Sequence, residues 1–341
     1  MNHTAISRKL WGIVLVGGDG TRVRAFLQHL CGGRGIKQFC AVLGRRSLLE
    51  HTLARVERVV PRARIVVVVS TDHRQEVAQQ LSQWPADNIL SQPANHDTVP
   101  GILLPLAHVS HWDPFATVAL FPATHFILDE ERFMASVQRA VAETQGCPHG
   151  LTLLGMRPDR TEEGYGWIKP AEEERGRATR VVRRFWEKPS RPCAQALLTR
   201  GALWNTCVGV AQAATVWEMT RQTDAELYDS FMAVRRALAH AHAAQVTESV
   251  YWMIRPVNFS PEVCARLPAR LRVLPVPAVG WSDWGSVERI GDTLQRLGKM
   301  NDTVQRALSA ASVSQQGEAR PHPALGSPAL TLRLATASER S

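Results

Sequence analysis

An apolar run that ends in a glycine-rich turn is the feature of this sequence that most constrains its fold. Residues 13–16 read Ile-Val-Leu-Val, and Gly17, Gly18, Asp19 and Gly20 follow directly. Four consecutive apolar residues predict a strand buried on both faces, which is typical of the parallel sheets of α/β proteins. Glycine permits positive φ and lets backbone N–H groups approach a ligand closely. The turn therefore predicts a binding site at the carboxyl end of the first strand.

Strand and helix patterns alternate along the chain after this turn. Residues 65–69 are all β-branched, and residues 116–121 form a further apolar run, so both stretches predict central strands. Ser47 and Glu50 have the spacing of a capping box, which predicts the start of a helix. The alternation indicates an α/β fold with a mostly parallel, open sheet and helices on both faces, a Rossmann-like arrangement.

Composition excludes several other classes of protein. Hydrophobic residues make up 45% of the chain and charged residues 21%, as in a globular domain. Residues 1–10 lack the apolar core of a signal peptide, and no apolar run is long enough for a membrane span, so we expect a cytoplasmic protein without membrane contacts. The six cysteines include no closely spaced pair and are interpreted as reduced thiols.

Charge and low periodicity add two further expectations. The net charge is +9, but the arginines are scattered, which favours anionic small molecules over nucleic acid as partners. Past residue 300 the chain is rich in Ala, Ser, Pro and Gln and has little periodicity. We therefore predict one domain over residues 1–300 and a disordered tail over residues 301–341.

Basic residues follow the glycine-rich turn. Successive N–H groups in such a turn form a concavity for anions, and Arg22 and Lys37 add positive charge for phosphate groups. The simplest interpretation is a nucleoside triphosphate held over the end of the first strand. A Gly-Gly-x-Gly turn alone is a weak motif, so a tight turn without a ligand is the alternative. Taken alone, Lys37 would be interpreted as a solvated surface lysine.

Five segments, in order over residues 11–298, together resemble the sugar nucleotidyltransferases, and within them the mannose-1-phosphate guanylyltransferases. The first is the glycine-rich turn with Lys37-Gln38-Phe39. The others are residues 92–100, residues 122–125, the Glu-Lys-Pro at residues 187–189 and the Trp-Ser-Asp at residues 281–283. The resemblance implies transfer of a nucleotide, with GTP as donor, onto a sugar 1-phosphate, with mannose 1-phosphate as acceptor, and release of pyrophosphate.

The resemblance also implies roles for particular residues at the nucleotide end. In this interpretation the triphosphate is neutralised by Arg22 and Lys37. The nucleotide would be held by Gly17, Gly18, Gly20, Thr21 and Gln92, the last of these near the base. His96 stands where relatives usually have an arginine, so the contact expected from that position is altered.

The sugar end rests on the Glu-Lys-Pro segment and its neighbours. By resemblance, the Glu187 carboxylate accepts hydrogen bonds from sugar hydroxyls, and the Lys188 ammonium meets the sugar phosphate. An exposed ion pair at a strand end is the alternative. Gly166 would let the backbone approach the sugar, and Asn205 offers an amide that both donates and accepts hydrogen bonds.

The implied metal site departs from the family. Asp283 matches the second metal carboxylate of the relatives, but Thr124 stands where they usually have the first metal-binding aspartate. Mg²⁺ prefers anionic oxygen ligands. We therefore expect Asp283, with Thr124 beside it, to hold Mg²⁺ or Mn²⁺ weakly. A helix N-cap at Asp283 or Ser286 is the alternative interpretation.

Two other functions compete with the transferase. A homologue that lost catalysis together with the aspartate would be a nucleotide or nucleotide-sugar binding module. NAD and lipid kinases also contain Gly-Gly-Asp-Gly-Thr, but well inside their chains, and the Glu-Lys-Pro and Trp-Ser-Asp segments have no meaning in a kinase. The expected mechanism is in-line attack of a sugar 1-phosphate oxygen on the α-phosphorus, with Arg22, Lys37 and Asp283 as the catalytic residues.

Overall fold

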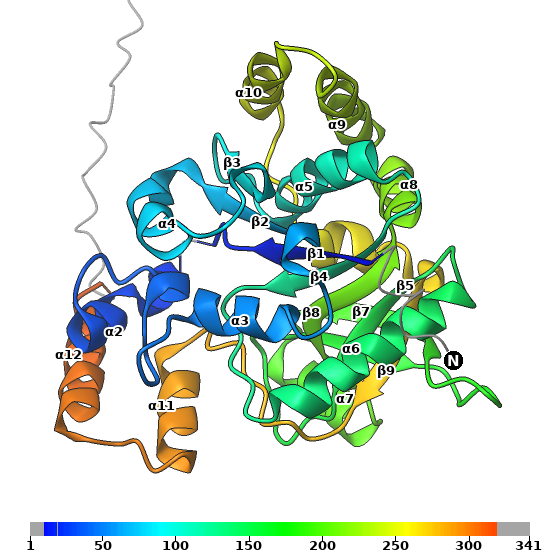
Figure 1. Cartoon of the computed structure of the whole chain (residues 1–341). Helices are drawn as coiled ribbons and strands as arrows, with labels where there is room; N and C mark the ends of the chain where they lie inside the picture. The colour runs from blue at the N-terminus through cyan, green and yellow to red at the C-terminus, as the bar shows by residue number, and fades with distance from the viewer. Residues whose placement is uncertain (1–9, 19, 319–341) are drawn as a thin grey trace, which may run out of the picture.

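Nine strands join into one sheet in the computed structural model, which describes residues 10–18 and 20–318 (Figure 1). The strands are, in chain order, β1 Leu10–Leu15, β2 Ile65–Ser70, β3 Ile89–Gln92, β4 Thr117–Pro122, β5 Leu151–Met156, β6 Gly166–Pro170, β7 Arg180–Glu187, β8 Leu203–Gln212 and β9 Leu271–Val276. Their order across the sheet is β3-β2-β1-β4-β8-β5-β9-β7-β6.

The four N-terminal strands form a parallel half. β1 is parallel to β2 and to β4, and β2 is parallel to β3. β2 is buried along its whole length, as its β-branched run predicts. Because all four strands point the same way, their carboxyl ends meet at one edge of the sheet, and the loops that follow them lie together.

The remaining strands form a mixed half that closes on itself. β8 is antiparallel to β4, β5 and β6, while β7 is antiparallel to β6 and β9, and β5 is parallel to β9. Since β8 pairs with both β5 and β6, the strands β5 to β9 form a closed ring. The α/β prediction is confirmed, but the prediction of a mostly parallel, open sheet is wrong for this half. Antiparallel strands can be joined by short connections in several orders, so the sequence of one strand does not reveal which strands it pairs with.

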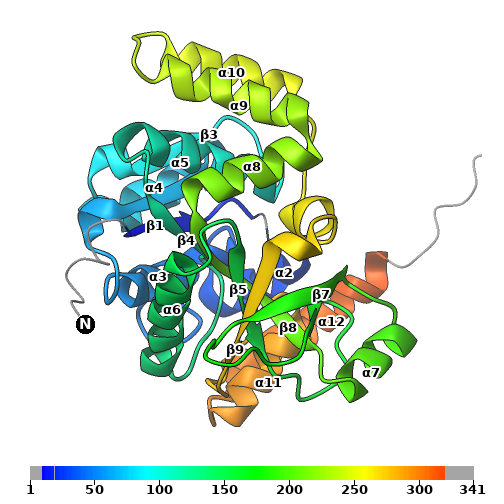
Figure 2. The same cartoon turned by 90° about the vertical axis from the view of Figure 1, so that its right-hand side faces the viewer.

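Helices cover both faces of the sheet (Figures 1 and 2). Alternate residues of β1 face opposite sides: Ile13 packs in a cluster with α5, α8 and α9, whereas Val14 packs in a second cluster with α3, α6 and α7. The helices are α2 Thr21–Cys31, α3 Leu48–Val56, α4 Arg74–Gln80, α5 Thr98–Trp112, α6 Glu130–Gln145, α7 Arg191–Thr199, α8 Ala213–Thr223, α9 Ala225–Ala237, α10 Ala243–Met253, α11 Val287–Arg296 and α12 Asp302–Glu318.

The last helix corrects one prediction from the sequence. Residues 302–318 form α12, which packs beside α2, so the prediction of a disordered tail is wrong for this stretch. Val304, Ala307 and Ala311 are buried against Phe26 and Leu27 of α2. Three apolar residues on one helical face were enough to pack that face against α2, although the surrounding composition is typical of a linker. Residues 319–341 lie outside the described part of the chain.

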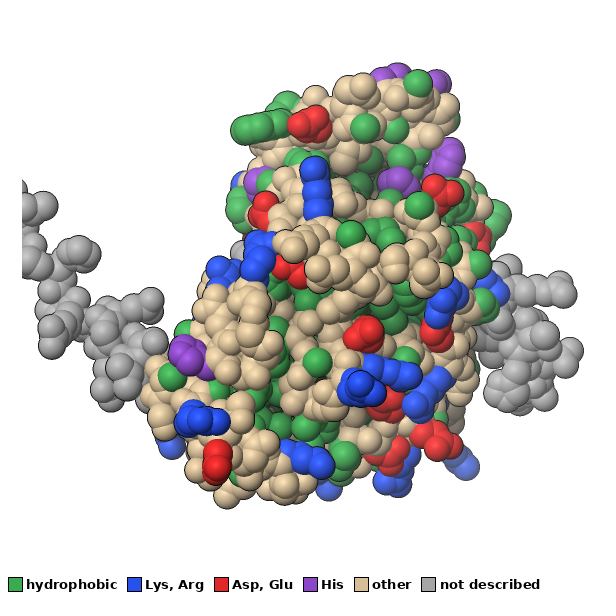
Figure 3. Space-filling view, turned by 60° about the vertical axis from the view of Figure 1, so that its left-hand side comes forward, with side chains coloured by type: hydrophobic (Ala, Val, Ile, Leu, Met, Phe, Trp, Pro, Cys, Tyr) green, Lys and Arg blue, Asp and Glu red, His purple; other side chains and the backbone are tan. Residues whose placement is uncertain are grey.

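The surface of the described residues carries charges of both signs. On the face in Figure 3, lysine, arginine, aspartate and glutamate side chains are interspersed rather than separated by sign. Within residues 10–18 and 20–318, no helix has the length and apolar character that a bilayer span requires.

Candidate active site

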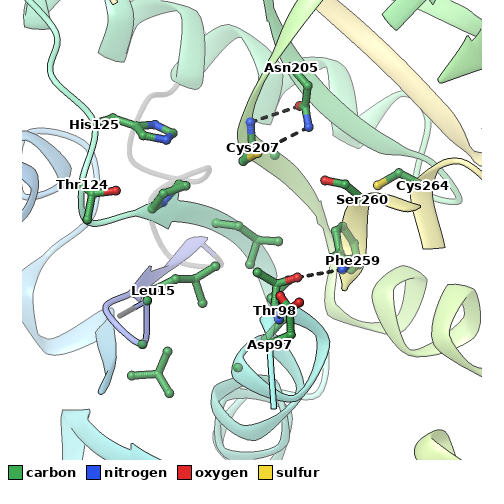
Figure 4. Close-up of a pocket in the computed structure, with 18 of the residues that line it drawn as sticks. Leu15, Asp97, Thr98, Thr124, His125, Asn205, Cys207, Phe259, Ser260 and Cys264 are labelled. Carbon is green, nitrogen blue, oxygen red and sulfur yellow. Dashed lines mark hydrogen bonds between the residues drawn. The ribbon is translucent and has the colours of Figure 1, made fainter. Parts of the chain in front are cut away.

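A cavity of about 590 Å³ lies at the carboxyl ends of the parallel strands and reaches under β8 (Figure 4). Its walls come from the two halves of the sheet, from the start of α5 and from the π-helical turn Ser260–Cys264. The predicted site residues that line it are Gly17, Gly18, Gln92, Thr124 and Asn205. Segments far apart in the sequence therefore share one cavity.

The glycine-rich turn leads from β1 to α2 along one edge of this cavity. Gly20 has φ 56°, and a Cβ placed on it would lie 3.0 Å from the Cβ of Lys37. Both the backbone conformation and the close approach therefore require glycine there. Thr21 begins α2, whose N-terminus has no side-chain cap and leaves its N–H groups available to an anion. Asp19 lies outside the described residues.

Lys37 lies behind the turn, on the 3₁₀ segment Lys37–Phe39. The residue is only 6% exposed, and its Nζ donates a hydrogen bond to the backbone oxygen of Asp283 at 2.5 Å. Burial lowers the pKa of Lys37 to about 8, and the charges of Arg289 and of the exposed Arg22 add to this while Asp283 opposes it. Lys37 is thus not a solvated surface lysine, and Arg22 lies close enough for their charges to interact.

The neighbouring Gln38 anchors the turn, a role that sequence reasoning missed. Its Nε2 donates to the backbone oxygens of Val16 at 2.8 Å and of Gly18 at 2.9 Å. The side chain is fully buried at 1% exposure. Its position in the Lys-Gln-Phe segment is the sequence signal that could have predicted this role for Gln38.

Gln92 lines the cavity from β3, next to the glycine-rich turn. Its Oε1 accepts a hydrogen bond from the Tyr251 hydroxyl at 3.1 Å, which leaves Nε2 directed at the turn. A Cβ on Gly17 would lie 2.8 Å from that Nε2, so the amide rests directly against the turn. Tyr251 comes from α10, and its ring also lies beside His96, with centroids 5.7 Å apart. Nothing in the sequence linked Tyr251 to this site.

The predicted sugar residues come together on three strands of the ring. A Cβ placed on Gly166, the first residue of β6, would lie 3.0 Å from Oε2 of Glu187 and 3.2 Å from Cβ of Asn205. Lys188 is exposed, and its Nζ lies 3.5 Å from Oε1 of Glu187. The Gly166 backbone, the Glu187 carboxylate and the Asn205 amide thus form one polar cluster.

The electrostatics of this cluster link it to the opposite wall. Burial raises the pKa of Glu187, Lys188 lowers it, and the charge of Asp97 beside α5 raises it further. Asn205 lies at a bulge of β8, where its Oδ1 accepts from the backbone N–H of Cys207 at 3.0 Å. Cys207 itself has φ 56°, a strained conformation for a non-glycine residue that lines the cavity (Figure 4).

The other wall joins Asp97 and Thr98, from the predicted segment 92–100, to residues 258–260, which sequence analysis did not assign to the site. Thr98, at the start of α5, accepts a hydrogen bond at Oγ1 from the Phe259 N–H at 2.7 Å. Asp97, with φ 67°, accepts two hydrogen bonds from the Asn258 amide at 3.0 and 3.1 Å. These bonds fix the segment that bears Ser260 against α5, as Figure 4 shows for Thr98 and Phe259.

Two loops bring position 124 next to Asp283. Phe126 and Ser282 exchange backbone hydrogen bonds of 2.9 and 3.0 Å, so the segment that carries Thr124 and His125 runs beside the Trp-Ser-Asp segment. His125 is buried, which lowers its pKa to about 3, so the ring is neutral at neutral pH. Its Nδ1 accepts from the Trp281 indole at 3.3 Å.

Asp283 is engaged by protein groups. Its Oδ1 accepts from the Gly285 N–H at 2.8 Å and lies 2.9 Å from Nε of Arg289, and its Oδ2 accepts from the same guanidinium at 3.3 Å. The helix that follows is capped by Ser286, not by Asp283. Within the described ranges, no group of three His, Cys, Asp or Glu side chains is arranged to hold a metal ion. The neutral Thr124 and the paired Asp283 do not fit a protein-held Mg²⁺.

The fold is that of a nucleotidyltransferase. The chain belongs to the nucleotidyl transferase family, whose model matches residues 11–299. It is 30% identical over 289 residues to the mannose-1-phosphate guanylyltransferase of Escherichia coli K12, a match that covers 82% of this chain and 58% of that protein. The mannose-1-phosphate guanylyltransferase ManC of Salmonella typhimurium LT2 is 29% identical over 287 residues, a match that covers 82% of this chain and 58% of that protein.

A solved structure supports the same fold. The crystal structure described as a mannose-1-phosphate geranyltransferase from Thermus thermophilus has a TM-score of 0.71 and 25% identity, over 86% of this chain and 80% of that chain. The chain spans less than two thirds of the length of the two curated relatives.

Proposed function

We propose that the chain joins GTP to mannose 1-phosphate and releases pyrophosphate. The observation that carries the proposal is that one cavity is lined at one end by Gly17 and Gly18 of the glycine-rich turn and at the other by Asn205. One end offers the glycine-rich turn with the buried Lys37, which suits phosphate groups. The other offers the cluster of Gly166, Glu187 and Asn205, which suits the hydroxyls of a sugar.

The proposed reaction is an in-line displacement. An oxygen of the sugar 1-phosphate attacks the α-phosphorus of GTP, a P–O bond forms there, and the bond to the β-phosphate oxygen breaks as pyrophosphate leaves. Backbone N–H groups at Gly17 and Gly18, with Lys37 and Arg22, would hold and neutralise the triphosphate. Such chemistry depends on positioning and on charge neutralisation, and it requires no covalent protein intermediate.

The sugar phosphate would lie against the ring of strands. Glu187 and Asn205 would bind hydroxyls, Lys188 would meet the phosphate, and Gln92 would lie near the base, with its Nε2 against Gly17. The family is typically metal-dependent. Mg²⁺ or Mn²⁺ stays a prediction for this chain, and because the residues at positions 124 and 283 do not fit the ion, we assign it no step.

Thr124 favours a second candidate, a nucleotide or nucleotide-sugar binding module without turnover. The experiment that separates the two is pyrophosphate release over a panel of nucleoside triphosphates and sugar 1-phosphates, with calorimetry of GTP and GDP-mannose alongside. We expect the fastest release with GTP and mannose 1-phosphate. Binding without release from any pair would support the binding module. The absence of both binding and release would contradict both candidates.

A further inference from the structure

Arg289 occupies an enclosed position against Asp283, one of the two residues of the implied metal site. The side chain is 7% exposed, and its guanidinium lies between two carboxylates. On one side it contacts both oxygens of Asp283, and on the other its Nη1 donates to Oε1 of Glu162 at 3.0 Å. Its carbon Cζ lies 4.7 Å from the centroid of the Tyr165 ring, which adds a cation–π contact.

The chain around this guanidinium leaves no space for larger residues. A Cβ on Gly164 would lie 2.8 Å from Nη1 of Arg289, and a Cβ on Gly285 would lie 2.6 Å from Nη2 and 2.5 Å from Oδ2 of Asp283. The Gly164 N–H also donates to Glu162 at 2.9 Å, which orients that carboxylate. Two glycines and two oriented carboxylates thus define a position for one planar cation.

The carboxylates at this position already have cationic partners, and Glu162 also lies 3.8 Å from Nε of Arg160. Asp283 and Glu162 face Arg289, while the Lys37 ammonium is bound to the backbone oxygen of Asp283. A divalent ion at Asp283 would have to displace a fixed cation and would meet the charge of Lys37, without a carboxylate from Thr124 to offset either.

We infer that the guanidinium of Arg289 stands in place of a divalent cation at Asp283, so that this chain binds its anionic ligand with side-chain cations and holds no metal ion of its own. Asp283 then acts as a positioning residue, since it orients Arg289 through its carboxylate and Lys37 through its backbone oxygen. The inference concerns the charge at the site in the proposed function and rests on that function only where nucleotide binding is measured.

The first test uses Mn²⁺ alone and needs no nucleotide. Free Mn²⁺ is titrated into the whole chain and followed by electron paramagnetic resonance. We expect no bound Mn²⁺ at micromolar concentrations of the ion. Micromolar binding that disappears in Asp283→Asn would overturn the inference.

Variants then test whether Arg289 is the residue that prevents a metal ion from binding at Asp283. Thr124→Asp alone should gain no Mn²⁺ binding, because Arg289 still engages Asp283, whereas Thr124→Asp combined with Arg289→Ser should bind Mn²⁺ at least about tenfold more tightly than the native chain. The matched control is Arg255→Ser, because Arg255 also bridges two carboxylates, Asp224 and Glu262, but at an exposed site. It should gain no tight Mn²⁺ binding.

Either variant result can contradict the inference. A Mn²⁺ site created by Thr124→Asp alone would show that Arg289 does not block the metal. A folded double variant that still binds no Mn²⁺ would show that Arg289 is not what excludes it. If circular dichroism shows that the double variant is unfolded, the Mn²⁺ titrations of the native chain and of Thr124→Asp still test the inference.

The second test measures GTP affinity by calorimetry in EDTA and in Mg²⁺. We expect dissociation constants that differ by less than about threefold, because the charge that faces the phosphates comes from side chains. A loss of tenfold or more in EDTA would contradict the inference. If GTP binds in neither condition, the proposed function fails, and the Mn²⁺ titrations still test Arg289 independently.

Discussion

The parallel half and the closed half of the sheet hold their functional groups in different ways. In the parallel half, most of the proposed groups lie on loops beyond the strand ends, at Gly17 after β1 and at Thr124 after β4, although Gln92 is the last residue of β3. In the closed half they belong to the strands themselves: Gly166 begins β6, Glu187 ends β7 and Asn205 lies within β8. A strand residue is held by the backbone ladder, whereas a loop residue depends on contacts from elsewhere in the chain.

Those contacts in the parallel half are long-range and few. Gln38 ties the glycine-rich turn to the segment after it, and Lys37 reaches an oxygen 246 positions later in the sequence. The comparison teaches that the proposed nucleotide end depends on single buried side chains, while the proposed sugar end is mostly part of the sheet. Substitutions should therefore have separable effects at the two ends.

The largest expected effect is that of Lys37→Met. Removing one charge-assisted contact should weaken GTP binding by about 1.5–3 kcal/mol, roughly ten- to a hundredfold in dissociation constant. Binding of mannose 1-phosphate should stay nearly constant, since the sugar cluster is on other strands. Calorimetry with each ligand measures both, and Lys299→Met, an exposed lysine, is the control. Unchanged GTP affinity would remove Lys37 from the phosphate site.

Glu187→Gln tests the opposite end. The amide keeps the shape and removes the charged acceptor, so affinity for mannose 1-phosphate should fall about tenfold while GTP binding changes little. The control is Glu172→Gln, which alters an exposed carboxylate paired with Arg183. An equal loss for both ligands would indicate that Glu187 supports the fold and would remove the distinction between the two ends.

The pH dependence of GTP binding should report Lys37 specifically. Its pKa in the free protein is about 8, so the ammonium that would bind phosphate is lost as pH rises through that value. Between pH 7 and 9 the dissociation constant should therefore rise by about tenfold if the bound ammonium stays protonated. The pH profile of Lys37→Arg, whose guanidinium stays charged over this range, is the control for ionisation of the guanine base of GTP. Identical profiles for both proteins would show that Lys37 does not titrate with binding.

The smallest expected effect concerns the turn itself. Gly20→Ala places a Cβ at positive φ and against Lys37, so the free energy of unfolding should fall by about 1 kcal/mol. Gly18→Ala, whose Cβ would meet nothing within 4 Å, should leave it nearly unchanged. Urea denaturation measures the difference. Equal values for the two variants would mean that the turn can relax without help from Lys37.

Sequence reasoning was more successful in the parallel half, for a physical reason. Continuous β-branched runs such as residues 65–69 can be buried in few ways, so β2 could be placed from its own residues. β8 pairs with three strands and bulges at Cys207, and no local pattern encodes a choice among antiparallel partners. The fold class was therefore predictable, whereas the closure of the sheet was not.

The candidate site divides in the same manner. The motifs predicted roles for Lys37 and Glu187, because each lies in a short segment that resembles the family, and the structure places Glu187 beside Asn205 and Gly166. The motifs did not reveal Arg289, since an arginine in the first turns of a helix has no local mark that it faces a carboxylate on a preceding loop. Contacts between distant segments, and the charge balance they create, required coordinates.

The packing of α12 on α2 has a practical consequence for where the working unit of this protein ends. The family match stops at residue 299, yet cutting the chain there would strip Val304, Ala307 and Ala311 from the apolar face of α2. Because α2 begins at the glycine-rich turn, loss of this packing would loosen a helix that adjoins the proposed phosphate site. A chain that ends where the family match ends would therefore lose a helix that supports the proposed nucleotide end. A chain that ends after α12 would keep that helix.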